Sequence, residues 1–304
     1  MASGPCHKSA ERGALTTIDF GVTATDFRER LFEKECWLAR AALPAEFRLG
    51  LPDIEEVLRS VEPVSPHLQL FDRGRISEGE FTQWTMTDNL PRRCLDGRFR
   101  ALLASGATLI LNSLDAHCAS AARLGEEVSR FAGFPTCSNA YVSFGGNGSF
   151  GAHWDTHDVV VLQLVGRKRW RVGPPTFPLP LPGQTSRRSG EAAPPPWTLD
   201  VRLEPGDLLY LPRGWWHEVT PLPEPSLHLS VGIYVPSVFD ALGLLCQQML
   251  PLELAARRGA IDEAATSRDL ASLVDVLRSA LADRALMTRL RGELAVPRAQ
   301  AREF

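Results

Sequence analysis

Short apolar runs of strand length, separated by turns that contain Gly or Pro, fill the chain from residue 137 to residue 234. The runs are residues 137–144, 158–165, 168–172, 200–203, 207–211, 215–220 and 226–234. The turn signals between them include Gly145-Gly146-Asn147-Gly148, Gly166, Pro205-Gly206-Asp207 and Pro212-Arg213-Gly214. Short strands at such close spacing predict an antiparallel β sandwich or barrel for this part of the chain.

Helical patterns flank the strand-rich part on both sides. Apolar residues recur at helical spacing over 23–33, 52–58 and 115–131 before it, and over 242–249 and 270–290 after it. We therefore predict a disordered tail over residues 1–14, a main domain over 15–236 with its β core at 137–234, and a helical region over 237–304. Residues 173–199, rich in Pro, Ser, Arg and Gly, are predicted to form an exposed insertion.

Composition excludes several classes of protein. The net charge of −3, from 33 basic and 36 acidic side chains, gives no basic field that would favour nucleic acid or an anionic membrane. No apolar run approaches the ~20 residues that a membrane-spanning helix requires, and the N-terminus lacks the apolar segment of a secretory signal. The six cysteines form no C-x-x-C pair, so free thiols in a cytoplasmic protein are expected.

Two histidines and an aspartate are candidate metal ligands. His153 and Asp155 are two residues apart, so on an extended segment both side chains project to the same face. His217 lies on a later strand, where alternation places it on one face with Trp215 and Val219. Two imidazoles and one carboxylate leave coordination positions open, as in the non-haem Fe(II) sites that react with oxygen. Zinc hydrolases can use similar ligands, so this set does not fix the metal.

The other histidines carry weaker patterns. His7, His67 and His117 have no partner pattern and are not expected to bind a ligand. His157 is expected beside the site or on the surface. His228 lies on the face of its strand opposite to Leu227, so it is expected to line the cavity without binding the metal.

Lys168 is expected to point inward. In the run Lys168-Arg169-Trp170-Arg171-Val172, the lysine shares a face with Trp170 and Val172, while the arginines face solvent. A buried ammonium costs several kcal/mol unless an anion meets it. That anion is either an Asp or Glu of the protein or the carboxylate of a bound cosubstrate. Asn139, Tyr141 and Ser230, on two other strands, are placed to hydrogen-bond such an anion.

Taken together, these segments resemble the JmjC/cupin-like 2-oxoglutarate oxygenases, and in particular their ribosomal oxygenase branch. The resemblance covers roughly residues 15–250 and is strongest over 137–234. Its motifs are Asn139-Ala140-Tyr141, His153-Trp154-Asp155-Thr156-His157-Asp158-Val159, Gln163-Leu164-Val165-Gly166-Arg167-Lys168-Arg169-Trp170, Pro205-Gly206-Asp207 and Pro212-Arg213-Gly214-Trp215-Trp216-His217. It implies a mainly β core, a double-stranded β-helix (jelly roll), with flanking N- and C-terminal helices.

The resemblance also implies a set of roles for the residues named above. His153, Asp155 and His217 would bind Fe(II), and Lys168 with Tyr141 would meet the distal carboxylate of 2-oxoglutarate. Asn139 would lie near this cosubstrate. The implied enzyme is a dioxygenase that uses O2 and 2-oxoglutarate to hydroxylate a C–H bond of a protein or peptide side chain, and releases succinate and CO2.

Two alternatives and one departure accompany this expectation. The substrate could instead be an amino acid or a natural-product intermediate, or the chain could be a metal-binding cupin without turnover. By this resemblance, ribosomal oxygenases would be longer chains, with a helical dimerisation region followed by a winged-helix domain. Residues 238–304 accommodate helices but not both of these parts. The apolar stripes of these helices either cover the barrel or form a homodimer seam, and the resemblance favours the homodimer.

Overall fold

The structure, a computed structural model of the 304-residue chain, describes residues 17–44, 49–84, 92–146, 148, 150–186 and 196–295. The chain divides into two compact units, Met1–Tyr234 and Val235–Phe304. The tail predicted over residues 1–14 lies outside the described residues. No helix within the described ranges is both long and apolar enough to cross a membrane.

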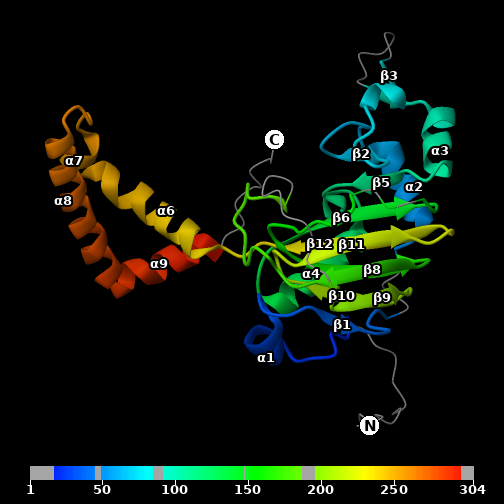
Figure 1. Ribbon diagram of the computed structural model, residues 1–304, viewed down its shortest axis with the longest axis horizontal. Helices are drawn as coiled ribbons and strands as arrows, with labels where there is room; N and C mark the ends of the chain where they lie inside the picture. The colour runs from blue at the N-terminus through cyan, green and yellow to red at the C-terminus, as the bar shows by residue number, and fades with distance from the viewer. Residues whose placement is uncertain are drawn as a thin grey trace. The chain divides into compact units, whose positions relative to one another are not determined.

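Two antiparallel sheets form the centre of the first unit (Figure 1). Among the described residues, seven strands make the larger sheet, in the order β1 (Trp37–Ala39), β10 (Leu208–Leu211), β7 (Asp158–Val165), β12 (Ser226–Ile233), β6 (Thr136–Ser143), β5 (Thr108–Leu111) and β2 (Leu68–Phe71). The smaller sheet has the order β11 (Trp216–Pro221), β8 (Lys168–Gly173) and β9 (Leu199–Leu203). A separate ribbon pairs β3 (Thr82–Trp84) with β4 (Arg92–Cys94).

The apolar core of the sandwich lies between the two sheets. Val159 and Val161 of β7 and Leu209 of β10 pack in one cluster with Trp170 and Val172 of β8. Strand alternation explains the arrangement, because the buried residues of β8 alternate with Arg169 and Arg171 on its outer face. Burial of these large side chains supplies most of the driving force for closing the sheets on each other.

Helices come before and between the strands of the larger sheet along the chain. They are α1 (Ala24–Asp26), a π-helical turn over Phe27–Leu31, α2 (Leu51–Ser60), α3 (Asp96–Ala104) and α4 (Ala119–Ala132). The helix expected over 23–33 begins as predicted, because Thr23 caps α1 by accepting the backbone N–H of Asp26. It then continues as a π turn, which a pattern of helical spacing does not distinguish from an α-helix.

The insertion expected at 173–199 is slightly shorter than predicted, because its first and last residues belong to strands. Gly173 ends β8 and Leu199 begins β9. The described part between them is mostly exposed, but it packs on tryptophans of the sandwich: Phe177 stacks on Trp154, and Thr176 accepts a hydrogen bond from the indole of Trp216.

The second unit is helical throughout its described part. It contains α6 (Val238–Met249), a 3-10 turn (Leu250–Leu252), α7 (Leu254–Arg257), α8 (Glu263–Ala282) and α9 (Arg284–Ala295). Ser237 and Asp240 cap α6 reciprocally. Leu245, Ala280, Leu286 and Leu290 form a small core that joins α6, α8 and α9.

Candidate metal centre and adjoining cavity

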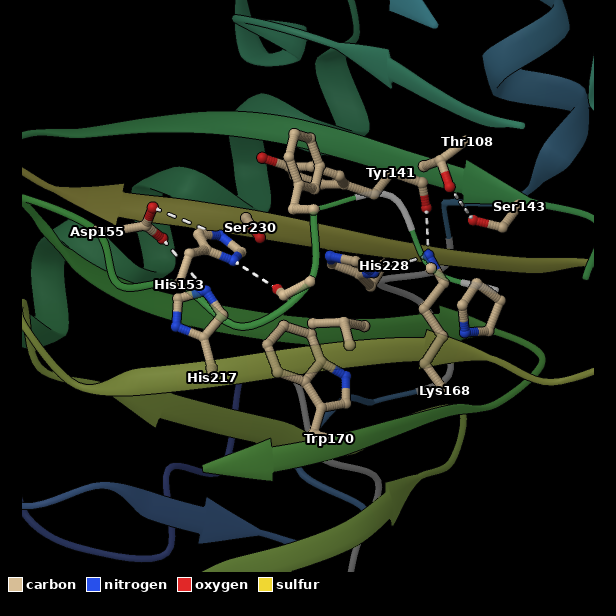
Figure 2. Close-up of a pocket in the computed structure, with 15 residues that line it drawn as sticks. Thr108, Tyr141, Ser143, His153, Asp155, Lys168, Trp170, His217, His228 and Ser230 are labelled. Atoms are coloured by element: carbon tan, nitrogen blue, oxygen red, sulfur yellow. Dashed lines mark hydrogen bonds and ion pairs between the residues drawn. The ribbon is translucent and has the colours of Figure 1, made fainter. Parts of the chain in front are cut away.

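The three candidate metal ligands meet at one edge of the sandwich (Figure 2). His153 and Asp155 lie in the loop between β6 and β7, not on a regular strand as their spacing predicted, and His217 lies on β11. His153 N donates to His217 O at 3.0 Å and His217 N donates to His153 O at 2.8 Å, which makes an isolated antiparallel bridge. Gly214 N donates to Asp155 O at 2.9 Å. The backbone therefore fixes all three side chains relative to one another.

The side chains present a donor set that fits a divalent metal. One ligand atom from each residue lies within 4.8 Å of the other two. Each imidazole has its Nδ1 3.1 Å from a carbonyl oxygen, that of Gly151 for His153 and that of Trp215 for His217. A carbonyl only accepts, so Nδ1 carries the proton and Nε2 keeps a lone pair for a metal. Two such nitrogens and one carboxylate suit Fe(II).

Electrostatics favour the protonation states that bind a metal. Burial alone would raise the pKa of the Asp155 carboxyl, but the neighbouring His217 and His153 hold it below its usual value. Burial and the nearby His153 lower the pKa of His217 to about 4. At neutral pH the aspartate is therefore charged and His217 is neutral, as metal ligands must be.

A cavity of about 230 Å³ adjoins the three ligands and extends between the sheets. Besides the ligands, its polar and aromatic lining includes Tyr141 on β6, Lys168 and Trp170 on β8, and His228 and Ser230 on β12. The cavity thus joins the candidate metal centre to the inward face of three strands (Figure 2).

Lys168 lies inside this cavity with only 1% of its surface exposed. Its Nζ donates to Tyr141 O at 3.0 Å and lies 2.9 Å from His228 Nδ1. No Asp or Glu among the described residues forms an ion pair with it, whereas Arg169 and Arg171 pair with acidic residues on the outer face. Burial lowers the pKa of Lys168 to about 7. Within the described ranges, therefore, no internal carboxylate of the kind considered from the sequence meets this lysine.

The remaining sequence-predicted residues divide between the cavity and its surroundings. The ring of Tyr141 stacks on that of His228, with centroids 4.8 Å apart and an interplanar angle of 4°. Ser230 lines the cavity and pairs in register with Asn139. The side chain of Asn139 is used elsewhere, since its Oδ1 accepts the backbone N–H of Ser113 at 2.9 Å.

Other histidines lie outside the cavity. His157 stacks on Tyr234 with centroids 5.7 Å apart, and His67 packs edge-on against His117. Sequence reasoning placed His228 in the cavity but missed its contact with Lys168. The signal that existed was strand alternation, which puts residues 228 and 230 of β12 on one face.

Known proteins share the domain and the fold. Residues 114–241 match the JmjC domain family. Human ribosomal oxygenase 1 is 31% identical over 241 residues, which is 76% of this chain and 35% of that protein. The bifunctional lysine-specific demethylase and histidyl-hydroxylase NO66 of Drosophila persimilis is 34% identical over 116 residues, 38% of this chain and 16% of that protein. The chain thus spans about a third or less of these relatives.

A solved structure extends the comparison to most of the chain. The ribosomal oxygenase YcfD from Escherichia coli, in complex with cobalt and 2-oxoglutarate, has a TM-score of 0.58 at 19% identity and covers 91% of this chain and 72% of that chain. The likeness confirms the predicted fold class, a mainly β jelly roll of the JmjC/cupin type with flanking helices.

Proposed function

Because the chain is a JmjC protein similar to the ribosomal oxygenases, we propose that it is an Fe(II)- and 2-oxoglutarate-dependent oxygenase that hydroxylates a C–H bond of a protein or peptide side chain. One observation carries the proposal. The buried Lys168 has no acidic partner among the described residues, and it shares a cavity with the His153, Asp155 and His217 cluster. A ligand with one end on a metal and an anionic end on the lysine satisfies both.

The residues of the chain have distinct tasks in this proposal. His153, Asp155 and His217 would hold Fe(II), and when bound the metal and 2-oxoglutarate supply the oxygen chemistry that yields succinate and CO2. Lys168 would neutralise the distal carboxylate, which compensates the cost of burying its ammonium. Tyr141 and Trp170 in the cavity wall would shield the bound carboxylate from bulk solvent and so strengthen its electrostatic attraction to the lysine.

A protein substrate is supported by what the relatives are named to do. Among them are ribosomal oxygenases and a histidyl-hydroxylase. Direct binding of nucleic acid is not part of this proposal, because a net charge of −3 provides no overall basic field. The four described cysteines, Cys36, Cys118, Cys137 and Cys246, are free thiols, which supports the expected cytoplasmic location.

An oxygen-dependent succinate assay tests the proposed activity. The full protein is incubated anaerobically with Fe(II) and 2-oxoglutarate, oxygen is admitted, and succinate is measured with peptides from ribosomal proteins or with free amino acids. We expect oxygen-dependent succinate, stimulated by a peptide that gains one oxygen atom, and none from His153→Ala. Stimulation by an amino acid alone would indicate a small-molecule hydroxylase. Absence of succinate under every condition would indicate a metal-binding cupin without turnover.

We further propose that the helical unit forms a homodimer. Its helices α6 and α8 expose large apolar side chains, among them Val238 (87% exposed), Phe239 (66%) and Leu270 (57%). Apolar patches of this kind on a helix favour association with a second apolar surface. Sedimentation of the wild-type protein should give a dimer and that of the double variant Phe239→Glu/Leu270→Glu a monomer. A monomeric wild-type protein at micromolar concentration would exclude this assembly.

A further inference from the structure

His228 is held rigidly at the back of the cavity. Its imidazole stacks flat on Tyr141, meets Trp170 nearly edge-on at a centroid distance of 5.4 Å and an angle of 74°, and is 4% exposed. In Figure 2 the ring lies between Lys168 and the three candidate metal ligands. A side chain clamped by two aromatic rings keeps its two nitrogens in fixed directions.

The contact with Lys168 determines which nitrogen of His228 carries the proton. Nδ1 lies 2.9 Å from the lysine Nζ, and an ammonium group can only donate. Nδ1 therefore accepts, and the proton of the neutral ring lies on Nε2. Burial, and then the charge of Lys168, lower the pKa of His228 well below its usual value, so the ring is neutral at physiological pH.

Among the described residues, the Nε2–H of His228 has no hydrogen-bond acceptor, and the ring that carries it lines the cavity. Trp170, whose ring packs against that of His228, has a fully buried indole N–H that also lacks a partner within the described part of the chain. Donors in a largely buried site are nearly always hydrogen-bonded in native proteins, so the unpaired N–H of His228 beside a buried cation indicates that a bound group in the cavity accepts from it. An anion with several acceptor oxygens is the chemical class that fits.

We propose that His228 is part of the anion site. Its Nδ1 accepts a hydrogen bond from Lys168 Nζ, and its Nε2–H donates a hydrogen bond to the distal carboxylate of the bound 2-oxo acid. The recognising unit is then the Lys168–His228 pair, not the lysine alone. This inference rests on the proposed function. It predicts selectivity for a dicarboxylate, because a 2-oxo acid that lacks the distal carboxylate leaves the Nε2–H of His228 without an acceptor and the ammonium of Lys168 without a counterion.

Calorimetric binding to the Mn(II)-loaded full protein tests the inference. The probes are 2-oxoglutarate and 2-oxopentanoate, which has the same carbon chain with a methyl group in place of the distal carboxylate. Three variants separate the two nitrogens: His228→Leu removes both, His228→Asn keeps an acceptor near the Nδ1 position, and His228→Gln keeps a donor near the Nε2 position. Thermal unfolding and Mn(II) affinity of each variant show that the fold and the metal site are intact.

We expect His228→Leu and His228→Asn to bind 2-oxoglutarate about tenfold or more weakly than the wild type, and His228→Gln to recover part of the loss. Binding of 2-oxopentanoate should change less than about twofold in all three variants. If His228→Asn binds 2-oxoglutarate as the wild type does, the histidine serves only to hold Lys168 and the inference is wrong. If the wild-type protein binds no 2-oxoglutarate, the proposed function itself fails.

Discussion

His153 and His217 hold each other by two backbone hydrogen bonds, at 3.0 Å from His153 N to His217 O and at 2.8 Å in the reverse direction. This bridge joins the loop before β7 to the first residues of β11, so the main chain brings the two imidazoles together. The carbonyls of Gly151 and Trp215 then orient the rings. The site is therefore preorganised, which lowers the entropic cost of metal binding.

The first prediction concerns this metal centre. The full protein should bind one Mn(II) or Co(II) per chain, and Asp155→Ala should lower that affinity by about 100-fold or more, because the only charged ligand of the cluster is lost. Calorimetric titration measures both. His117→Ala is the matched control, since this histidine packs against His67 away from the cluster. Unchanged affinity in Asp155→Ala would remove the cluster from consideration as a metal site.

The second prediction is that the ligand-free protein is destabilised by Lys168. Burial lowers the pKa of Lys168 from 10.5 to about 7, so between these pH values the unfolded chain holds a proton that the folded chain lacks. The free energy of unfolding therefore rises with pH across this window, and the penalty is largest below pH 7. At pH 7 it is roughly 4 kcal/mol, from about 1.4 kcal/mol for each pKa unit.

Lys168→Met tests the penalty, because methionine is unbranched and carries no charge. The variant loses the hydrogen bonds to Tyr141 O and His228 Nδ1. Their loss costs about 2 kcal/mol and so offsets part of the stability gained by removing the buried charge. We expect it to be more stable than the wild type by roughly 2 kcal/mol at pH 6.5 and less stable above pH 10, where the charge penalty is absent. Urea unfolding at the two pH values measures this reversal. A variant that is less stable at both would contradict the assigned burial of a charged lysine.

Strand alternation predicted much of the site, because it is a local property of the chain. Lys168, Trp170 and Val172 are buried on β8 as their spacing predicted, and the outward Arg169 pairs with Asp200. The sequence pattern could place these side chains on a face because β8 is regular over its whole length. The same argument failed for His153 and Asp155 in detail, since they lie in a loop that the bridge to β11 holds extended.

Contacts between distant segments could not be predicted in the same way. Asn139 was placed correctly on the face of Tyr141, but its side chain bonds the backbone of Ser113, in the turn after β5. The contact between Lys168 and His228 joins residues 60 positions apart. Whether a polar side chain faces a cavity or binds a turn depends on which segments pack beside it, and no local pattern contains that information.

The third prediction concerns a buried ion pair at the start of β7, directly after the loop that carries His153 and Asp155. Asp158 is fully buried, accepts the hydroxyl of Tyr210 at 2.7 Å and pairs with Arg213 at 3.1 Å. Arg213→Met leaves this carboxylate without a cation among the described residues and should cost about 3 kcal/mol of unfolding free energy at pH 8. Adding Asp158→Asn should recover at least half of the loss, because the amide still accepts from Tyr210 and carries no charge.

Lowering the pH should reduce the loss of unfolding free energy that Arg213→Met causes. Burial raises the pKa of the Asp158 carboxyl above its usual value even with Tyr210 and Arg213 in place, and removal of the cation raises it further. A protonated carboxyl needs no cation, so the stability difference between Arg213→Met and the wild type should be smaller at pH 5 than at pH 8. Urea unfolding of the single and double variants measures both effects. An equal loss in the double variant would show that Arg213 acts through Glu33 alone, its other partner.

The fourth prediction concerns the turn that leads into Lys168. Gly166 has φ +55°, and a Cβ there would lie 2.1 Å from Pro225 O, so alanine strains the backbone and displaces the neighbouring loop. Gly166→Ala should therefore lower the free energy of unfolding by about 3 kcal/mol or more. Gly183→Ala is the matched control, because its φ of +85° carries the same kind of strain but no atom lies within 4 Å, which limits its cost to about 1 kcal/mol. Losses in the two variants that agree within about 0.5 kcal/mol would show that the contact with Pro225 yields without cost.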